Sequence, residues 1–290
     1  MNRETSKLSA SDGTKLAVYT WPAANPRGVV QLTHGMGEHA LRYGELAAAL
    51  CASGWTVVAQ DHRAHGASAD SEEDLGQIGP DGWGALVEDI DTVRSHATAL
   101  APGLPFVLFG HSMGSFALQQ YLPWGSTGVD AVVMTGTAAL DLLEPALDLE
   151  APLDLAMFNA PFAPARTDFD WLSRDEERVD AYVADPLCGF GLDLDGVKGL
   201  FAGARPLAAL DALAAVRSDL PIYIAVGEHD PVNGGLALIH PLVDRYRAAG
   251  LTDVELKIYE GARHELSNET NRTEFTVDLI LWLDARFPKS

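Results

Sequence analysis

The stretch Gly110-His111-Ser112-Met113-Gly114 decides the fold that we predict for this chain of 290 residues. It follows an apolar run at 105–109, which predicts a buried strand, and it precedes residues 115–121, which predict a helix. A serine between glycines at such a junction is typical of a nucleophile elbow, a strained turn that exposes the hydroxyl group. We therefore predict that Ser112 is a nucleophile. The alternative is a Gly-Ser turn with a purely structural role.

Two later loops supply the partners that a nucleophilic serine needs, in the chain order Ser, Asp, His. Asp230 follows an apolar strand pattern at 220–226, and His264 follows another at 254–259. Side chains that follow parallel strands lie at the carboxyl edge of the sheet, where open α/β sheets keep their sites. We predict that His264 takes the proton of Ser112 and that Asp230 orients the imidazole.

Both partners have competitors in the sequence. Glu228 and Asp253 are alternative acids, and Asp230 is preferred because it follows the tight glycine turn that ends its strand. His264 is preferred as the base because it alone lies in the loop after the last strand. The other histidines lie inside the elbow, before that loop or outside it: His111, His34, His39, His62, His65, His96, His229 and His240.

The tetrahedral intermediate of such a reaction needs two backbone N–H donors. One comes from the residue after the nucleophile, here Met113, and the other from a loop after an early strand. The strand pattern at 29–33 is followed by a glycine-rich loop at 34–37, in which Met36 is the predicted second donor. A glycine-rich connection without a catalytic role is the alternative for this loop.

Several segments together resemble the monoacylglycerol lipase and lysophospholipase branch of the α/β-hydrolases, a group also described as serine aminopeptidase-like. Besides the elbow they are His34-Gly35-Met36-Gly37-Glu38-His39, Arg42-Tyr43, Asp61-His62-Arg63-Ala64-His65-Gly66-Ala67-Ser68, Arg263-His264-Glu265 and Asn268-Glu269. The middle segments 169–175 and 185–190 resemble bacterial members of the group. The resemblance covers nearly the whole chain, and it implies the same roles for Ser112, Asp230, His264, Met36 and Met113.

One residue departs from the pattern of that family. Ala64 stands where a glycine is usual, between the arginine and the histidine of the 61–68 segment. We expect a slightly stiffer loop and no change in the chemistry. The neighbouring His62 and His65, with Asp61, could form a metal site, but the resemblance makes this loop a structural brace. No metal and no cofactor are expected.

The rest of the chain predicts an α/β-hydrolase fold. A hairpin at roughly 6–21 is followed by alternating strand and helix patterns, which predict a mostly parallel eight-stranded sheet with helices on both faces. The strand pattern stops at about residue 137 and resumes at about 219. We therefore predict a core formed by 1–136 and 219–290, and a helical cap at 137–218 inserted after the sixth strand.

Apolar side chains of this cap are expected to roof the site. We predict that Met157, Phe158 and Leu200 contact the substrate, together with His111 beside the nucleophile.

The composition limits the classes of partner that the chain is expected to bind. The chain has 20 basic and 41 acidic residues, a net charge of −21, which argues against nucleic acid and against attraction to an anionic membrane. It has no apolar run long enough for stable membrane insertion and no apolar signal core near its start. The two cysteines, Cys51 and Cys188, favour buried thiols over a disulfide, so a cytoplasmic location is expected.

These observations predict a serine carboxylic-ester hydrolase that works through an acyl-enzyme. A monoacylglycerol or lysophospholipid-type ester is the favoured substrate, so the expected partner is a small-molecule ester or lipid. Hydrolysis of small aryl or alkyl esters, amide or peptide hydrolysis, cofactor-free perhydrolysis and non-catalytic binding are the alternatives. A monomer and a homodimer both agree with the sequence.

Overall fold

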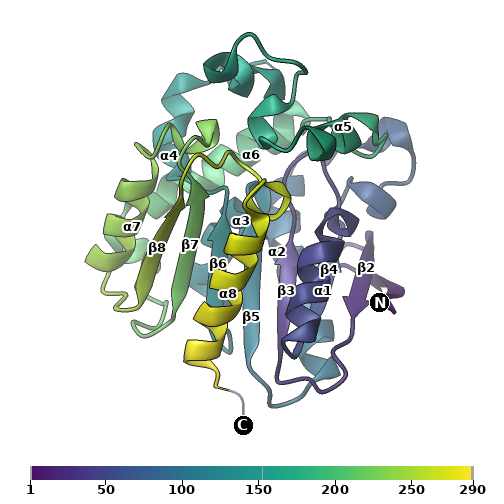
Figure 1. The fold of residues 1–290 in the computed structure, drawn as a ribbon, viewed down its shortest axis with the longest axis vertical. Helices are drawn as coiled ribbons and strands as arrows, with labels where there is room; N and C mark the ends of the chain where they lie inside the picture. Colours follow the sequence, from purple (N-terminus) through teal and green to yellow (C-terminus); the bar gives the residue numbers. More distant parts are fainter. Residues whose placement is uncertain (1, 152, 289–290) are drawn as a thin grey trace.

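A single sheet of eight strands forms the centre of the computed structural model, which describes residues 2–151 and 153–288 (Figure 1). The strands are β1 (Glu4–Ser9), β2 (Lys15–Trp21), β3 (Gly28–Thr33), β4 (Trp55–Gln60), β5 (Phe106–His111), β6 (Ala131–Thr135), β7 (Ile222–Gly227) and β8 (Val254–Tyr259). Their order in the sheet is β1-β2-β4-β3-β5-β6-β7-β8. This sheet confirms the predicted fold class.

The pairing of the strands places the site. β1, β2 and β4 pair antiparallel, whereas every neighbouring pair from β4 to β8 is parallel. After β3 the chain forms β4 on one side of it and β5 on the other, so the loops that follow β3 and β5 diverge at this point. A crevice at the carboxyl ends of such strands is where open α/β sheets bind ligands.

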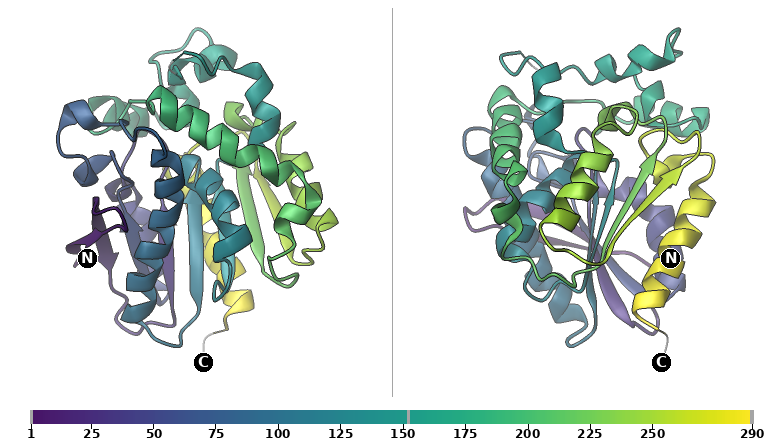
Figure 2. Two further views of the ribbon diagram at one scale, coloured as in Figure 1. Left: turned by 180° about the vertical axis from the view of Figure 1, so that it is seen from behind. Right: turned by 90° about the vertical axis from the view of Figure 1, so that its left-hand side faces the viewer.

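Helices cover both faces of the sheet, which explains why its central strands are buried along their whole length and mostly apolar. The helices outside the segment between β6 and β7 are α1 (Gly44–Ala52), α2 (Gly82–Leu100), α3 (Met113–Gly125), α7 (Ile239–Ala248) and α8 (Arg272–Arg286). α1 and α8 lie on one face, while α2, α3 and α7 lie on the other (Figures 1 and 2). Alternate residues of β5 serve the two cores, with Leu108 in one and Phe109 in the other.

The segment between β6 and β7 lies above the carboxyl ends of the strands (Figures 1 and 2). Those of its residues that the structure describes form α4 (Leu140–Leu143), α5 (Glu176–Ala184), α6 (Leu194–Ala204) and several 3₁₀ turns, without a strand. α6 packs against α2 and α3 of the core. We propose this segment as the cap, with the boundaries 137–218 given by the sequence.

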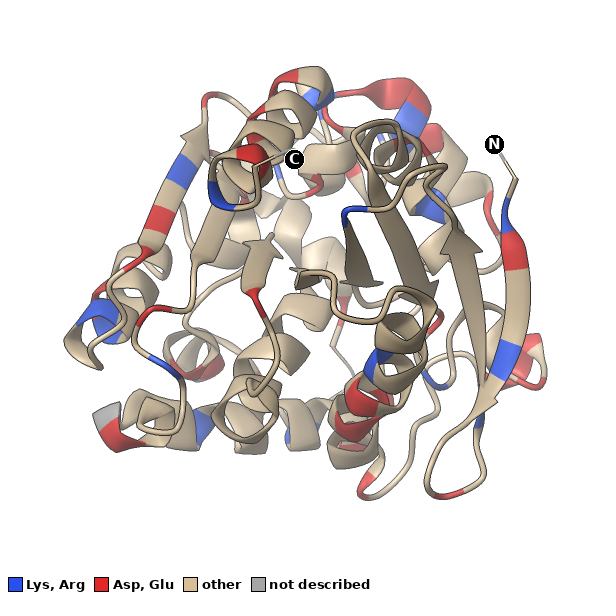
Figure 3. Ribbon diagram, turned by 90° about the horizontal axis from the view of Figure 1, so that it is seen from below, with Lys and Arg blue, Asp and Glu red and all other residues tan. Residues whose placement is uncertain are grey.

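Charge and cysteine placement add two observations. Acidic residues occur on many separate helices, strands and loops in the view from below (Figure 3). Cys51 and Cys188 are both free thiols; Cys51 is buried as expected, whereas Cys188 is partly exposed. Within the described ranges, helices that are both long and apolar enough to cross a bilayer are absent.

Candidate active site

Ser112 lies at a sharp turn between β5 and α3, in a backbone conformation that serine rarely adopts. Its φ is 50° and its ψ is −120°. The flanking glycines are required by space: a Cβ on Gly110 would lie 2.8 Å from the Gly114 carbonyl oxygen, and one on Gly114 would lie 2.3 Å from the Thr33 carbonyl oxygen. The local geometry is therefore that of the predicted elbow, in which strain is stored at a functional position.

His264 and Asp230 meet at the carboxyl edge of the sheet, although 34 residues separate them in the chain. His264 Nδ1 lies 2.9 Å from Asp230 Oδ1, and both side chains are buried. The Asp230 carboxylate also accepts the backbone N–H of Val232, which fixes its orientation. Since Asp230 engages Nδ1, Nε2 is the nitrogen left to serve a nucleophile.

The same carboxylate sets the basicity of the imidazole. Burial alone would lower the pKa of His264, but the charge and the hydrogen bond of Asp230 outweigh burial and raise that pKa above its ordinary value. A higher pKa makes His264 a stronger proton acceptor in its neutral form.

The competing acids are engaged elsewhere. The Glu228 carboxylate accepts the backbone N–H of Gly261 at 2.9 Å and is partly exposed. Asp253 forms an ion pair with Arg286, with an N–O distance of 2.5 Å. The geometry thus agrees with the preference for Asp230.

Several competing histidines also have other partners. His39 Nε2 lies 2.9 Å from a carboxylate oxygen of Asp185. His34, His62 and His65 form a buried cluster of rings. His264, by contrast, pairs with the buried Asp230 carboxylate and lines the same pocket as Ser112.

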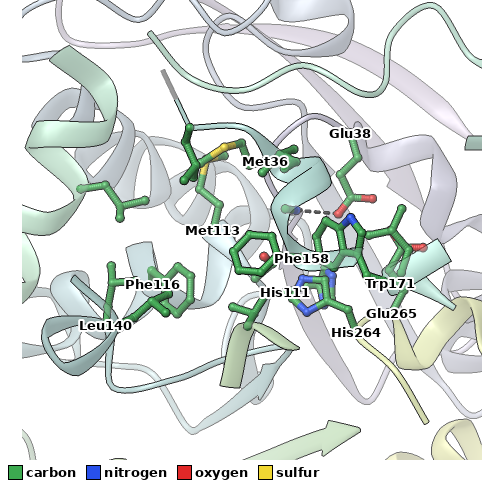
Figure 4. Close-up of a pocket in the computed structure, with 18 of the residues that line it drawn as sticks. Met36, Glu38, His111, Met113, Phe116, Leu140, Phe158, Trp171, His264 and Glu265 are labelled. Carbon is green, nitrogen blue, oxygen red and sulfur yellow. Dashed lines mark hydrogen bonds between the residues drawn. The ribbon is translucent and has the colours of Figure 1, made fainter. Parts of the chain in front are cut away.

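The loop that follows β3 runs directly beside Ser112. A Cβ on Gly35 would lie 3.2 Å from the Ser112 Cβ, so the absence of a side chain there permits the close approach. Met36 of this loop and Met113, the first residue of α3, both line the same pocket as Ser112 (Figure 4). The N–H of Met113 belongs to the first turn of a helix, where backbone donors have no partner within the helix.

Ser112 and His264 open into a largely apolar pocket with about 690 Å³ of empty space. His111, Phe158 and Leu200, three of the predicted substrate contacts, line it. His111 and Phe158 are labelled in Figure 4. Most of the other apolar side chains of the wall come from α3, α4, α6 and the 3₁₀ helices and loops between β6 and β7: Phe116, Leu140, Leu143, Leu147, Leu153, Leu155, Trp171, Leu172, Val197 and Phe201.

The structure corrects the prediction for Met157, the fourth expected substrate contact. Its side chain is 43% exposed, and it is not among the residues that line this pocket. Residues 155–162 form a 3₁₀ helix, in which side chains three apart share a face. Leu155 and Phe158 therefore point into the pocket together, and Met157 between them points outward.

Two further residues shape the site: Trp171, one of the apolar cap side chains expected to roof it, and Gly136, which was not predicted. The Trp171 ring lies 4.9 Å from the His264 ring and 5.1 Å from that of Phe158, measured between centroids. A Cβ on Gly136 would lie 2.8 Å from His264 Cε1 and 2.7 Å from His111 Cε1. Trp171 lies within a segment that resembles bacterial relatives, whereas Gly136 carries no signal in the sequence.

A buried ion-pair network connects the loop after β3 with the loop of His264. Arg42 Nη1 lies 2.5 Å from Glu38 Oε2, and both terminal nitrogens of Arg42 bind Glu265 at 2.5 and 2.7 Å. The hydroxyl of Tyr43 donates to Glu38 at 2.6 Å, and Asn268 donates to Glu265. Residues from several of the family motifs thus form one network of ion pairs and hydrogen bonds. The sequence alone did not reveal that these residues contact one another.

Among the described residues, two groups bring potential metal ligands within 4.8 Å of one another: His39, Asp185 and Cys188, and Glu38, His111 and Glu265. In both groups protein hydrogen bonds already engage the carboxylates. The metal set considered from the sequence is not assembled, because Asp61 instead accepts the N–H groups of Ala40 and Ala67.

Fold and site geometry together define an α/β-hydrolase. The chain belongs to the Hydrolase_4 family, described as serine aminopeptidase, S33, whose model matches residues 24–271. This confirms the family that the sequence motifs resemble.

Characterised relatives extend over nearly the whole chain. A monoacylglycerol lipase from Mycolicibacterium smegmatis is 33% identical over 288 residues, covering 97% of this chain and 97% of the relative. The human monoglyceride lipase is 30% identical, covering 96% of this chain and 90% of the relative. Fold, family and relatives make this chain a serine ester hydrolase.

Solved structures agree with the fold. A thermostable carboxyl esterase from Bacillus coagulans, determined in complex with glycerol, superposes with a TM-score of 0.87 at 24% identity, over 99% of each chain. A soluble variant of the Saccharomyces cerevisiae monoglyceride lipase superposes with a TM-score of 0.78 at 22% identity, covering 100% of this chain and 97% of the other.

Proposed function

We propose that this chain hydrolyses single-chain acyl esters of the monoacylglycerol or lysophospholipid type through an acyl-enzyme on Ser112. The observation that carries the proposal is the strained Ser112 at the base of an apolar pocket whose wall also holds a histidine backed by a buried carboxylate. The monoacylglycerol lipases from M. smegmatis and human support the substrate class.

In the first half of the reaction, the Ser112 oxygen attacks the ester carbonyl carbon while His264 Nε2 takes its proton. The carbonyl oxygen becomes an oxyanion, which the N–H groups of Met36 and Met113 stabilise. Asp230 stabilises the imidazolium that forms. As the intermediate collapses, His264 gives the proton to the leaving alcohol, and the acyl group stays on Ser112.

In the second half, water enters in place of the alcohol. His264 removes a proton from the water, whose oxygen attacks the acyl carbon and forms a second oxyanion in the same place. Collapse breaks the bond to Ser112, His264 returns the proton to the serine oxygen, and the fatty acid leaves.

The pocket wall supports an acyl chain as the bound group. Leucine and phenylalanine are ten of its 22 lining residues, and burial of each methylene of a substrate there contributes about 0.8 kcal/mol. A longer chain is therefore favoured until it reaches the end of the pocket.

The test is hydrolysis of p-nitrophenyl esters from two to sixteen carbons, and then of 1-monoacylglycerols, by the native chain and by Ser112→Ala. We expect kcat/KM to rise with chain length, and the Ser112→Ala variant to lose at least about 10⁴-fold. Activity that is confined to two- to four-carbon esters would replace the lipid substrate with small esters. Activity that survives in Ser112→Ala would refute the mechanism.

A further inference from the structure

The residue before the predicted oxyanion donor is held from both sides by buried side chains. The Gly35 N–H donates to Glu38 Oε1 at 2.6 Å, the bond drawn as a dashed line in Figure 4. The Gly35 carbonyl oxygen lies 2.7 Å from His34 Nδ1. His34 and Glu38 are 0% and 2% exposed, so these bonds are shielded from water.

The tautomer of His34 follows from its second nitrogen. The backbone N–H of His62 donates to His34 Nε2 at 3.0 Å, so Nε2 carries a lone pair and the ring proton is on Nδ1. Burial keeps the pKa of His34 well below its ordinary value, so the ring stays neutral. Nδ1–H is therefore a donor, and the Gly35 carbonyl oxygen accepts from it.

This bond fixes the direction of the next N–H group. The peptide between Gly35 and Met36 is trans, and in a trans peptide the C=O and N–H bonds point in opposite directions. Since the Gly35 carbonyl points to the buried His34 ring, the Met36 N–H points away from it. Gly35, Met36 and Ser112 all line the pocket, and Gly35 lies beside the Ser112 Cβ.

The Glu38 carboxylate is itself held in place. Tyr43 donates to the oxygen that binds Gly35, and Arg42 binds the other oxygen and connects it to Glu265, the residue after His264. The guanidinium group of Arg42 thus connects the loop that carries Met36 with the loop that carries His264.

We propose that His34 and Glu38 are positioning residues that hold the Met36 N–H in the direction of the oxyanion before substrate binds. This rests on the proposed function, since it assigns work to the oxyanion donor of that reaction. Donors that are already oriented need no reorganisation when charge develops, which is the basis of their effect on rate. Each side chain acts through Gly35: Glu38 accepts from its N–H, and His34 donates to its carbonyl oxygen.

The decisive comparison is His34→Leu with His34→Asn. Asparagine places an N–H donor where Nδ1 stands, leucine has nearly the same shape without a donor, and both leave the His62 N–H equally unpaired. Glu38→Ala removes the acceptor on the other side of Gly35. The matched control is Asp130→Asn, which alters a carboxylate that accepts a backbone N–H, from Phe106 at 2.7 Å, outside the pocket.

We would measure kcat and KM for a p-nitrophenyl ester, together with Ki for a trifluoromethyl ketone, which forms an oxyanionic adduct with the serine. We expect His34→Leu and Glu38→Ala to lower kcat about 10²-fold at nearly constant KM and to weaken Ki by the same factor. His34→Asn should recover at least about tenfold of this loss, and Asp130→Asn should match the native chain.

Equal activities of the leucine and asparagine variants, or a rise in KM with constant kcat, would overturn the positioning role while Ser112-dependent hydrolysis stands. If Glu38→Ala does not fold, the pair at His34 still decides. If the native chain shows no hydrolysis that depends on Ser112, the proposed function is overturned, and the positioning role with it.

Discussion

At the scale of single residues, the backbone of Ser112 carries most of the functional information. A positive φ at a non-glycine residue costs about 1–3 kcal/mol, and it persists only where the surroundings impose it. Here Gly110 and Gly114 permit it, because a Cβ at either position would lie too close to neighbouring backbone atoms. The pentapeptide pattern predicted this turn because its glycines and serine are all local in the chain.

The raised pKa of His264 predicts the pH dependence of the reaction. In the proposed mechanism the neutral imidazole is the base, so kcat/KM should rise with pH through the pKa of His264, with a midpoint above its ordinary value of 6.5. In Asp230→Asn, the charge that raises this pKa is gone. We expect about a 10⁴-fold lower kcat and an acid limb displaced to lower pH. Steady-state kinetics from pH 5 to 9 measure both, and an unmoved limb would contradict the role of Asp230.

Ala64 predicts a stabilising substitution. Its φ is 56°, in the left-handed region, and its carbonyl accepts the N–H of Gly76. Relief of about 1–2 kcal/mol of strain exceeds the added entropy of the unfolded chain, about 0.4–1 kcal/mol. Ala64→Gly should therefore raise the free energy of unfolding by about 0.5–1 kcal/mol in urea titrations. Ala69→Gly, at φ −75°, is the control and should lower it.

The sequence did not reveal which side chains of residues 155–162 face the pocket. Phe158 and Leu200 line it, whereas Met157 does not, because Met157 lies on another face of the 3₁₀ helix Leu155–Phe162. Asp230 could be preferred over Glu228 from the position of the turn alone, and the structure pairs Asp230 with His264.

At the scale of elements, the loops at the carboxyl edge of the sheet are fixed by contacts between distant parts of the chain. Arg42 and Glu265 are separated by 223 residues, and Gly37 accepts hydrogen bonds from Tyr182 and Gly189 of the proposed cap. Motifs marked these segments as special, but one sequence contains no signal for which charged residues pair. The network could therefore be found only in the structure.

The buried histidine cluster predicts a loss of stability in acid. Burial lowers the pKa of His62 to about 3 and that of His65 to about 4, against 6.5 in the unfolded chain. Between these values the unfolded chain binds more protons, so stability falls as pH falls from 6.5 towards 4. Each histidine contributes a slope of about 1.4 kcal/mol per pH unit.

Urea titrations at pH 7, 6 and 5 test this slope. His65→Asn should remove about one proton from the difference between the unfolded and folded chains. Equal slopes for the native chain and His65→Asn would show that His65 is not held neutral.

At the scale of the whole molecule, the alternation of strand and helix patterns predicted the sheet and the insertion. It succeeded because burial on both faces makes the strands β3, β5 and β7 mostly apolar, a pattern that is readable without tertiary contacts. The shape of the pocket could not be predicted, since its wall combines α3 with several short pieces of the proposed cap.

That wall predicts how to change the substrate range. Leu200 on α6 is 3% exposed and lines the pocket, so Leu200→Trp should fill space that a long acyl chain occupies. We expect kcat/KM for twelve-carbon esters to fall at least about tenfold, as loss of two to three buried methylenes implies, with four-carbon esters little affected. Leu281→Trp, at a side chain 58% exposed on α8, is the control. An equal loss for both esters would contradict the acyl assignment.

The central claim is that Ser112 carries the acyl group during turnover. Rapid mixing with an excess of p-nitrophenyl ester, acid quenching within milliseconds and mass spectrometry of the intact chain test it most directly. We predict a mass increase of one acyl group, located to the peptide that contains Ser112 and missing in Ser112→Ala. An acyl group found on another residue would contradict the account. Turnover of the ester by Ser112→Ala, without any acyl-enzyme, would contradict it too.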